Sequence, residues 1–220
     1  MSRKELILRS IATTLGSVIS AFGISLTIKA NFGVSPWDVL SFGLSKSVFH
    51  CSYGTATVSV SATILCISLL MREKIGIGTL TDACITGKVI DFFLRSDLVP
   101  YIENNFVVSV LLMALGFLIL GYSQWIKMTV ALSCGPRDCL QLAIGRRLQK
   151  FPVSFALFLI MLAALIVGWI LGGPVGWGTL FSPFLASGMQ WVAFQTLHFE
   201  ARAIKHQDVV ESWRILTKGA

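Results

Sequence analysis

The sequence contains few charged residues. Asp, Glu, Lys and Arg make up 13% of its 220 positions, against about 25% in a typical soluble domain. Hydrophobic residues make up 55% of the chain, and the mean hydropathy is +0.77. No Asp, Glu, Lys or Arg occurs between Val153 and Phe199. This composition excludes a soluble globular protein and predicts an all-α integral membrane protein, with little chain left for a soluble domain.

The residues and motifs that build metal centres and hydrolase sites are also scarce. The five cysteines show no CxxC spacing, and the three histidines are scattered. We therefore expect no metal and no cofactor, and we interpret the cysteines as small buried apolar residues. The motifs HExxH and GxSxG are absent as well. An enzyme is accordingly not expected.

Two short motifs recur after one hundred residues. Ser35–Asp38 (SPWD) corresponds to Gly135–Asp138 (GPRD), and Gly76–Leu80 (GIGTL) corresponds to Gly176–Leu180 (GWGTL). Two motif pairs at one offset favour the duplication of a unit of about one hundred residues. The predicted organisation is two membrane repeats and a basic amphipathic tail, at residues 1–97, 98–199 and 200–220.

Each repeat is expected to contain three membrane-spanning helices and one short helix. A span needs about 20 apolar residues, and the candidates are residues 10–28, 53–71, 79–94, 106–126 and two spans within 153–199, separated at Gly172–Pro174. The short helices, residues 36–49 and about 136–147, would reach only about 21 Å, less than the apolar core of about 30 Å. They are expected to be re-entrant or interfacial.

Capping patterns indicate where several of these helices begin. Ser35 suits the N-cap position, with Pro36 as the first helical residue and Asp38 two positions further on. Thr79, followed by Asp82, is predicted to cap the fourth helix of its repeat, and Thr179 the last helix of the chain. The remaining motif residues are assigned to close packing and turns: Gly33, Pro36, Gly76, Gly78, Gly135, Pro136, Gly176 and Gly178.

The distribution of basic residues predicts how the repeats lie in the membrane. Lys and Arg collect on the cytoplasmic side of membrane proteins. With six crossings, fourteen of them lie inside, Lys127 and Arg137 included, and three lie outside, namely Lys29, Lys46 and Arg95. Equivalent loops of the two repeats differ in charge, so we expect them on opposite sides. The repeats are therefore predicted to be inverted, with both termini cytoplasmic.

The stretch Gly33–Leu40 (GVSPWDVL), with Gly76–Leu80 downstream, resembles the YczE/YyaS/YitT family of bacterial membrane proteins. The resemblance covers nearly the whole chain except the basic tail. The second repeat departs from the motif, because Arg137 stands where the first repeat has Trp37. The resemblance implies a multi-pass protein of the bacterial cytoplasmic membrane. Some relatives are linked to transport or to the support of secondary-metabolite production.

Ten residues are candidates for a substrate or ion pathway. Ionisable groups within a span are functional candidates, because they are costly there unless paired or wet. The candidates are Ser35, Trp37, Asp38, Thr79, Asp82, Lys88, Asp91, Arg137, Asp138 and Thr179.

Each charged candidate has a structural alternative. Asp38 and Asp138 either cap their helices or line a common pathway, and Asp82 either caps its helix or lies in the pathway. Lys88 and Asp91, three residues apart, are close enough to neutralise each other along one helix. Trp37 is either an interfacial anchor or a pathway residue. Arg137 is either a cytoplasmic charge or a group that holds an anionic substrate at a helix N-terminus.

These patterns favour a small transporter or permease that moves a small molecule or ion along the interface of two inverted repeats. The alternative is a non-transporting accessory protein that supports a partner enzyme. The expected partners are the lipid bilayer and an unidentified substrate, with no nucleic acid, and the sequence leaves homo-oligomerisation open.

Overall fold

The computed structural model describes residues 3–71, 77–99, 101–103, 105–130, 135–137, 140, 144 and 153–198. Those residues form helices and the turns that connect them, without a strand. The helices are α1 (Arg3–Lys29), α2 (Pro36–Leu44), the π-helix η1 (Ser45–Phe49), α3 (Tyr53–Leu70), α4 (Ile77–Arg95), α5 (Phe106–Val130), α7 (Val153–Ile170) and α8 (Trp177–Thr196). The all-helical fold predicted from the sequence is confirmed.

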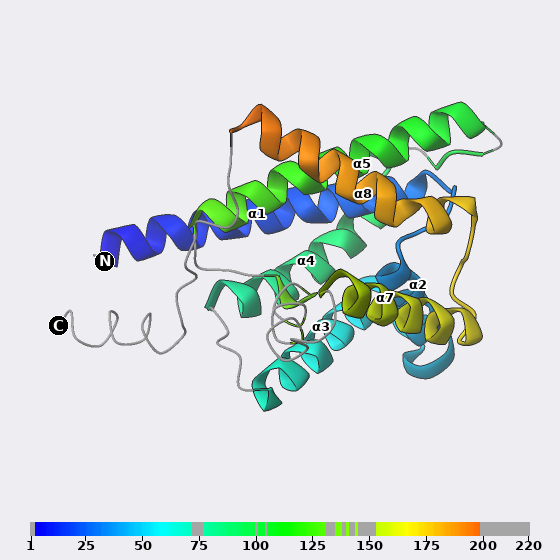
Figure 1. Cartoon of the computed structure of the whole chain (residues 1–220), viewed down its shortest axis with the longest axis horizontal. Helices are drawn as coiled ribbons and strands as arrows, with labels where there is room; N and C mark the ends of the chain where they lie inside the picture. The colour runs from blue at the N-terminus through cyan, green and yellow to red at the C-terminus, as the bar shows by residue number, and fades with distance from the viewer. Residues whose placement is uncertain are drawn as a thin grey trace.

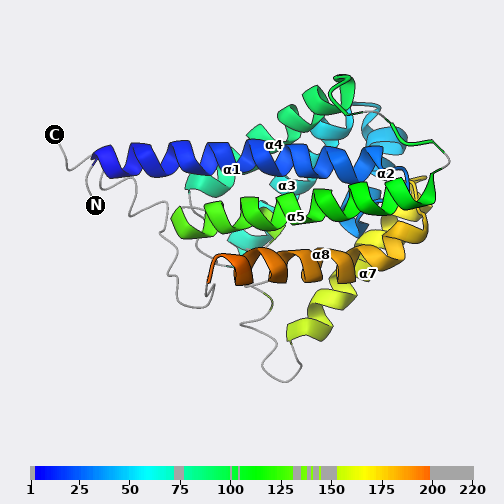
Figure 2. The ribbon, with the colours of Figure 1, turned by 90° about the horizontal axis from the view of Figure 1, so that it is seen from above.

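The helices are arranged in two layers. Figure 1 shows α1, α5 and α8 above the other helices, and Figure 2 shows the same three helices side by side in one row. The second layer contains α2, α3, α4 and α7. Within it, α2 of the first repeat packs on α7 of the second, where Gly43 lies against the backbone of Gly168.

The first helices of the two predicted repeats, α1 and α5, run antiparallel. At one end Arg9 Nη1 donates to the carbonyl oxygen of Val130 at 3.3 Å, and near the other Gly23 lies against Gly116. In contrast, α4 runs parallel to α1, since Ser17 bonds Asp82 while Lys29 bonds Ser96. The α5–α8 pair is also parallel.

Equivalent helices of the two repeats keep the offset of the motifs. Helix α3 spans Tyr53–Leu70 and α7 spans Val153–Ile170, while α4 begins at Ile77 and α8 at Trp177. The breakers explain these bounds. Gly172 has a left-handed φ of +78°, and Pro174 follows it in a non-helical stretch, as the sequence predicts.

Within the part of the chain that the structure describes, three helices are long and apolar enough to cross a membrane: Ile7–Lys29, Tyr53–Leu70 and Phe106–Val130. These correspond to three of the six predicted spans. A shorter apolar helix covers Phe158–Ile170 within the described residues. Helix α4 is long enough, but it carries four charged residues.

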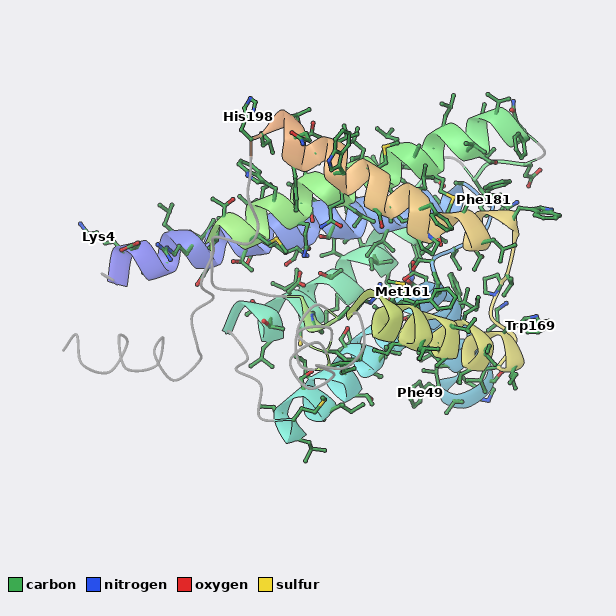
Figure 3. All side chains as sticks on the ribbon, viewed as in Figure 1. Lys4, Phe49, Met161, Trp169, Phe181 and His198 are labelled. Atoms are coloured by element: carbon green, nitrogen blue, oxygen red, sulfur yellow. The ribbon has the colours of Figure 1, made fainter. Side chains whose placement is uncertain are left out.

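Many hydroxyl side chains are buried and many large apolar side chains are exposed, which is unusual in a soluble protein. Hydroxyl side chains such as Thr13, Ser17 and Ser123 are fully buried between helices. Large apolar side chains face outward: Trp169 is 66% exposed and Phe181 57%, and Figure 3 shows both at the periphery. Extended apolar surfaces of this kind mark contact with a membrane or a partner.

Several helix ends differ from the prediction. Helix α5 continues to Val130, beyond the predicted end of its span at residue 126, so Lys127 lies inside the helix and is buried. Lys29 also turns inward and donates to the carbonyl oxygens of Ser96 and Val99, at 2.6 and 2.8 Å. In the second short helix, Pro136 and Arg137 are helical, while its other residues mostly lie outside the described part, as does the tail.

Candidate functional site

The two recurring motifs meet at the start of α2. The amide of Gly178 donates to the carbonyl oxygen of Phe32 at 2.8 Å, and the amide of Val34 donates to Thr179 Oγ1 at 3.2 Å. Gly33 adopts a φ of +133°, where an added Cβ would lie 2.6 Å from the Thr179 nitrogen. The residues directly before the SPWD motif are therefore held by the GWGT motif.

Thr179 stabilises this junction from within α8. The helix has Gly176 as its N-cap, so Thr179 is the third helical residue. Its Oγ1 accepts from the Gly176 amide at 3.2 Å as well as from Val34. The predicted capping role is confirmed, although Thr179 acts from inside the helix rather than as the N-cap residue.

Asp38 lies at the centre of the junction and is 3% exposed. Its Oδ2 accepts from Ser35 Oγ at 2.6 Å, and its Oδ1 from the Tyr53 hydroxyl at 2.8 Å. Arg137 Nη2 also donates to Oδ1, at 3.3 Å. The N-cap residue Ser35 makes no side-chain capping bond. Asp38 is the third residue of α2, where its charge complements the helix dipole as the capping interpretation requires, and its oxygens also accept hydrogen bonds from side chains.

Trp37 and Arg137, which are equivalent by sequence offset, stack on each other. The guanidinium carbon of Arg137 lies 5.5 Å from the centre of the Trp37 ring, within cation–π range. Trp37 is 8% exposed and packs with Val60, Ile64 and Leu140. Its indole nitrogen has no hydrogen-bond partner among the described residues. The interpretation of Trp37 as an interfacial anchor is wrong, whereas the side of the membrane on which Arg137 lies stays a prediction.

Asp82 forms a second buried centre, between α1, α4 and α5. Since α4 begins at Ile77, Asp82 lies in its second turn rather than at its cap. Its Oδ1 accepts from Ser17 Oγ at 2.6 Å and from Thr86 Oγ1 at 3.1 Å. Lys127 Nζ lies 3.3 and 3.5 Å from the two carboxylate oxygens. The capping alternative for Asp82 is wrong, because Asp82 lies in the second turn of α4 and its carboxylate bonds side chains of α1 and α5.

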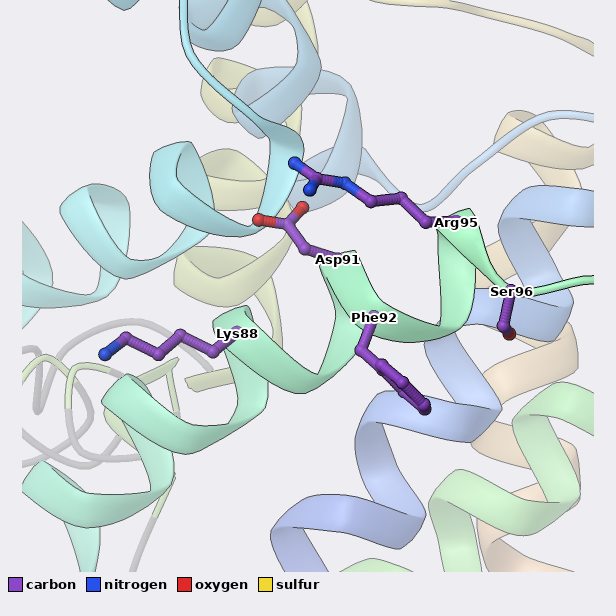
Figure 4. A pocket seen from close by; sticks show the side chains of 5 residues that line it. All are labelled: Lys88, Asp91, Phe92, Arg95 and Ser96. Carbon is purple, nitrogen blue, oxygen red and sulfur yellow. The ribbon is translucent and has the colours of Figure 1, made fainter.

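Asp91 and Lys88 border an open hollow of about 440 Å³ on α4 (Figure 4). Asp91 accepts from Ser52 Oγ and from the Gly54 amide, the latter at 2.7 Å. Lys88 is exposed and extends away from Asp91, and the ion pairs of the described residues do not include this one. The predicted Lys88–Asp91 pair is wrong, because Asp91 bonds the first turn of α3 instead.

The structure therefore divides the predicted candidates among three places. Ser35, Trp37, Asp38, Arg137 and Thr179 gather at the motif junction, whereas Asp82 lies in the α1–α4–α5 interface and Lys88 and Asp91 lie at the hollow. Thr79 is buried within α4. Gly33, Gly176 and Gly178 lie at the junction. Pro36 and Pro136 are the first helical residues of their short helices. Gly135 directly precedes Pro136, and Gly78 lies in α4. Asp138 and Gly76 lie outside the described residues.

Three contributing residues were not among the predicted candidates. Tyr53 supplies a donor to Asp38, and Ser17 and Lys127 surround Asp82. One sequence signal could have indicated Lys127. It directly follows a long charge-free run, so a helix that extends one turn beyond that run includes it. Tyr53 and Ser17 carry no such signal.

Comparison with known proteins gives a family but no solved fold. The profile of a family of unknown function (DUF6198) matches residues 7–192. The uncharacterized membrane protein YczE of Bacillus subtilis (strain 168) is 31% identical over 185 residues, which cover 83% of this chain and 84% of the relative. The uncharacterized protein YyaS of the same strain is 32% identical, over 76% and 83% of the two chains. An uncharacterized protein of Haemophilus influenzae is 26% identical, over 79% and 78%. No solved structure matches the chain.

Proposed function

The chain belongs to the DUF6198 family of unknown function, and on the geometry of its own residues we propose that it is a small membrane transporter rather than an enzyme. The proposed transporter moves a small molecule or ion along the interface of two inverted repeats. It lies in the bacterial cytoplasmic membrane, with both termini in the cytoplasm.

The helix arrangement supports the inverted repeat. Two pairs of equivalent helices begin at an offset of one hundred residues, α3 and α7 at Tyr53 and Val153, and α4 and α8 at Ile77 and Trp177. The equivalent helices α1 and α5 run antiparallel, and each runs parallel to the fourth helix of its own repeat. A unit and its copy related in this way have opposite directions across the bilayer. Such repeats, with interrupted helices near their interface, are typical of secondary transporters.

The observation that carries the proposal is the ion pair between the buried Asp38 and the partly exposed Arg137. The acid comes from the first SPWD-type motif and the base from the second, so the pair lies where the two repeats meet. Charges buried inside a membrane protein are costly and are usually functional. The pair also closes the interface in this structure. Opening a route along that interface requires the pair to separate, and a substrate that bonds either partner lowers the cost of separation.

A solute screen followed by a flux measurement tests this function. The purified protein in detergent is screened by melting temperature against amino acids, small carboxylates, inorganic anions and alkali cations. A compound that binds the folded state raises the melting temperature. We expect at least one stabilising compound to show counterflow in proteoliposomes. Asp38→Asn should abolish counterflow, whereas Glu103→Gln, which removes an exposed loop carboxylate, should leave it unchanged.

The accessory function remains a second candidate, because both buried carboxylates are fully paired with protein groups in this structure. A scaffold needs a closed, stable interface and no route. It predicts that wild-type and Asp38→Asn proteoliposomes are equally impermeable to every compound of the panel, and that result would overturn the transporter.

A further inference from the structure

We propose that the oxygen atoms around Asp82 form a binding site for a monovalent cation, which the ammonium group of Lys127 occupies in this structure. The inference rests on the proposed function in one respect: the bound cation would be the coupling ion for transport. Binding itself is measurable in detergent without any flux, so the two proposals can fail separately.

The site lies inside the helix bundle, between the middle of α1 and the last turn of α5. Ser17, which bonds Asp82, is ten residues from Ile7 and twelve from Lys29, the ends of the α1 span. Asp82 is 5% exposed and Lys127 is 7% exposed. Burying both charges costs several kcal/mol per ion before their attraction offsets it. An apolar pair would pack these helices at lower cost, so the cluster is better explained by binding than by stability.

The carboxylate that faces the ammonium is a group that hard cations prefer. Asp82 offers two carboxylate oxygens, and the hydroxyls of Ser17 and Thr86 donate to one of them at 2.6 and 3.1 Å. Carboxylate oxygens are typical ligands of hard cations. The cluster contains one negative charge, and within the described residues no group of three or more His, Cys, Asp or Glu could hold a metal ion. The charge therefore matches a single positive ion.

Lys127 is placed to leave the site. Its nitrogen lies 3.3 and 3.5 Å from the carboxylate oxygens, which is longer than the 2.7–2.9 Å of a tight ammonium–carboxylate bond. It lies three residues before Val130, where α5 ends, so its flexible stem can carry the ammonium to the membrane surface. Lys127 is the one charged residue of α5, and α1 has none between Arg9 and Lys29. No other base on those helices replaces it, so Asp82 would need a cation from solution.

Gly16 makes the room that Lys127 occupies. A Cβ added at Gly16 would lie 2.8 Å from Lys127 Cγ, so an alanine there pushes the flexible stem aside without removing a charge. Gly16→Ala and Lys127→Met are therefore two independent ways of emptying the same site. The first keeps the ammonium in the protein and weakens its hold on Asp82, whereas the second deletes it.

The experiment measures melting temperature in detergent at pH 8, with NaCl, LiCl or KCl replacing choline chloride at constant ionic strength. In Lys127→Met, at a salt concentration tenfold above the dissociation constant, a bound alkali cation raises the melting temperature by roughly 3–5 °C. We expect a saturable rise with one of the cations. Gly16→Ala should show a smaller rise, and the double variant Asp82→Asn/Lys127→Met should show none. Lys4→Met, which removes an exposed lysine, should behave as wild type.

Two results would overturn the site. One is an equal melting temperature for Lys127→Met in all four salts; the other is a cation effect that persists in the Asp82→Asn double variant. If Lys127→Met yields no folded protein, Gly16→Ala decides alone: a cation response no greater than that of the wild type contradicts the proposal.

Discussion

The Asp38–Arg137 pair is unequal in its exposure to solvent, and this determines which partner the fold depends on. The Asp38 side chain is 5% exposed, whereas that of Arg137 is 29% exposed. An arginine left without its acid can turn towards water or headgroups. A carboxylate left without its base stays buried among Ser35 and Tyr53, whose hydroxyl bonds offset only part of the lost ion pair. The base should therefore matter more for stability than the acid.

We predict that Arg137→Gln destabilises the protein more than Asp38→Asn does. Leaving the buried carboxylate unpaired should cost about 3 kcal/mol, against about 1–2 kcal/mol for a partly exposed arginine. The double variant should be more stable than Arg137→Gln alone, because no unpaired buried charge remains. Melting temperatures of the three variants in one detergent check the order. If Asp38→Asn is the most damaging, the stability of the junction does not depend on neutralising Asp38.

At the scale of helices, a glycine determines how closely the segment before α2 approaches the start of α8. Gly33 combines a left-handed φ of +133° with contact on the Thr179 backbone, so neither its conformation nor its space admits a side chain. Gly188, in the middle of α8, has nothing within 4 Å of an added Cβ. The two positions give a matched comparison of the same substitution.

We predict that Gly33→Ala costs at least about 2 kcal/mol, because it adds backbone strain to a clash at the junction of the two motifs. Gly188→Ala should instead stabilise by up to about 1 kcal/mol, since alanine has a lower entropic cost in a helix. Thermal unfolding of both variants in detergent is the measurement. A Gly33→Ala protein as stable as the wild type would mean that the segment before α2 does not contact the start of α8 as described.

The element scale also separates what the sequence predicts from what it cannot. Breakers act locally, so Pro36 and Gly172 mark helix ends that the structure reproduces. Partners of buried charges depend on which helices pack together, which no local pattern encodes. The motif predicts Asp38 as a site residue, but its donor Tyr53 follows only from the packing of α2 on α3. The residues next to Lys127 in the sequence likewise give no sign of its pairing with Asp82 on α4.

At the scale of the whole molecule, the proposed inversion determines which side of the membrane each loop faces. Because α1 and α5 run antiparallel and α4 and α8 each follow their partners, the ends of α4 and α8 point to opposite faces. Asp97, just after α4, and His198, just after α8, are both exposed. They occupy nearly equivalent positions in the two repeats, so under inversion they mark opposite sides. Lys4 and Glu103, near the starts of α1 and α5, do the same.

We predict opposite accessibility for these positions in intact cells that carry a cysteine-free protein. A membrane-impermeant maleimide should label Asp97→Cys and Glu103→Cys without lysis. Lys4→Cys and His198→Cys should react only after the cells are opened. Labelling of all four after lysis, but of none of the denatured cysteine-free parent, controls for reactivity.

Labelling of Asp97→Cys and His198→Cys from the same side would contradict the inversion, because two repeats with their last helices in the same direction cannot present the two short helices from opposite leaflets. The Asp38–Arg137 pair would then be a contact between parallel repeats, and the proposed route along their interface would lose its symmetry argument.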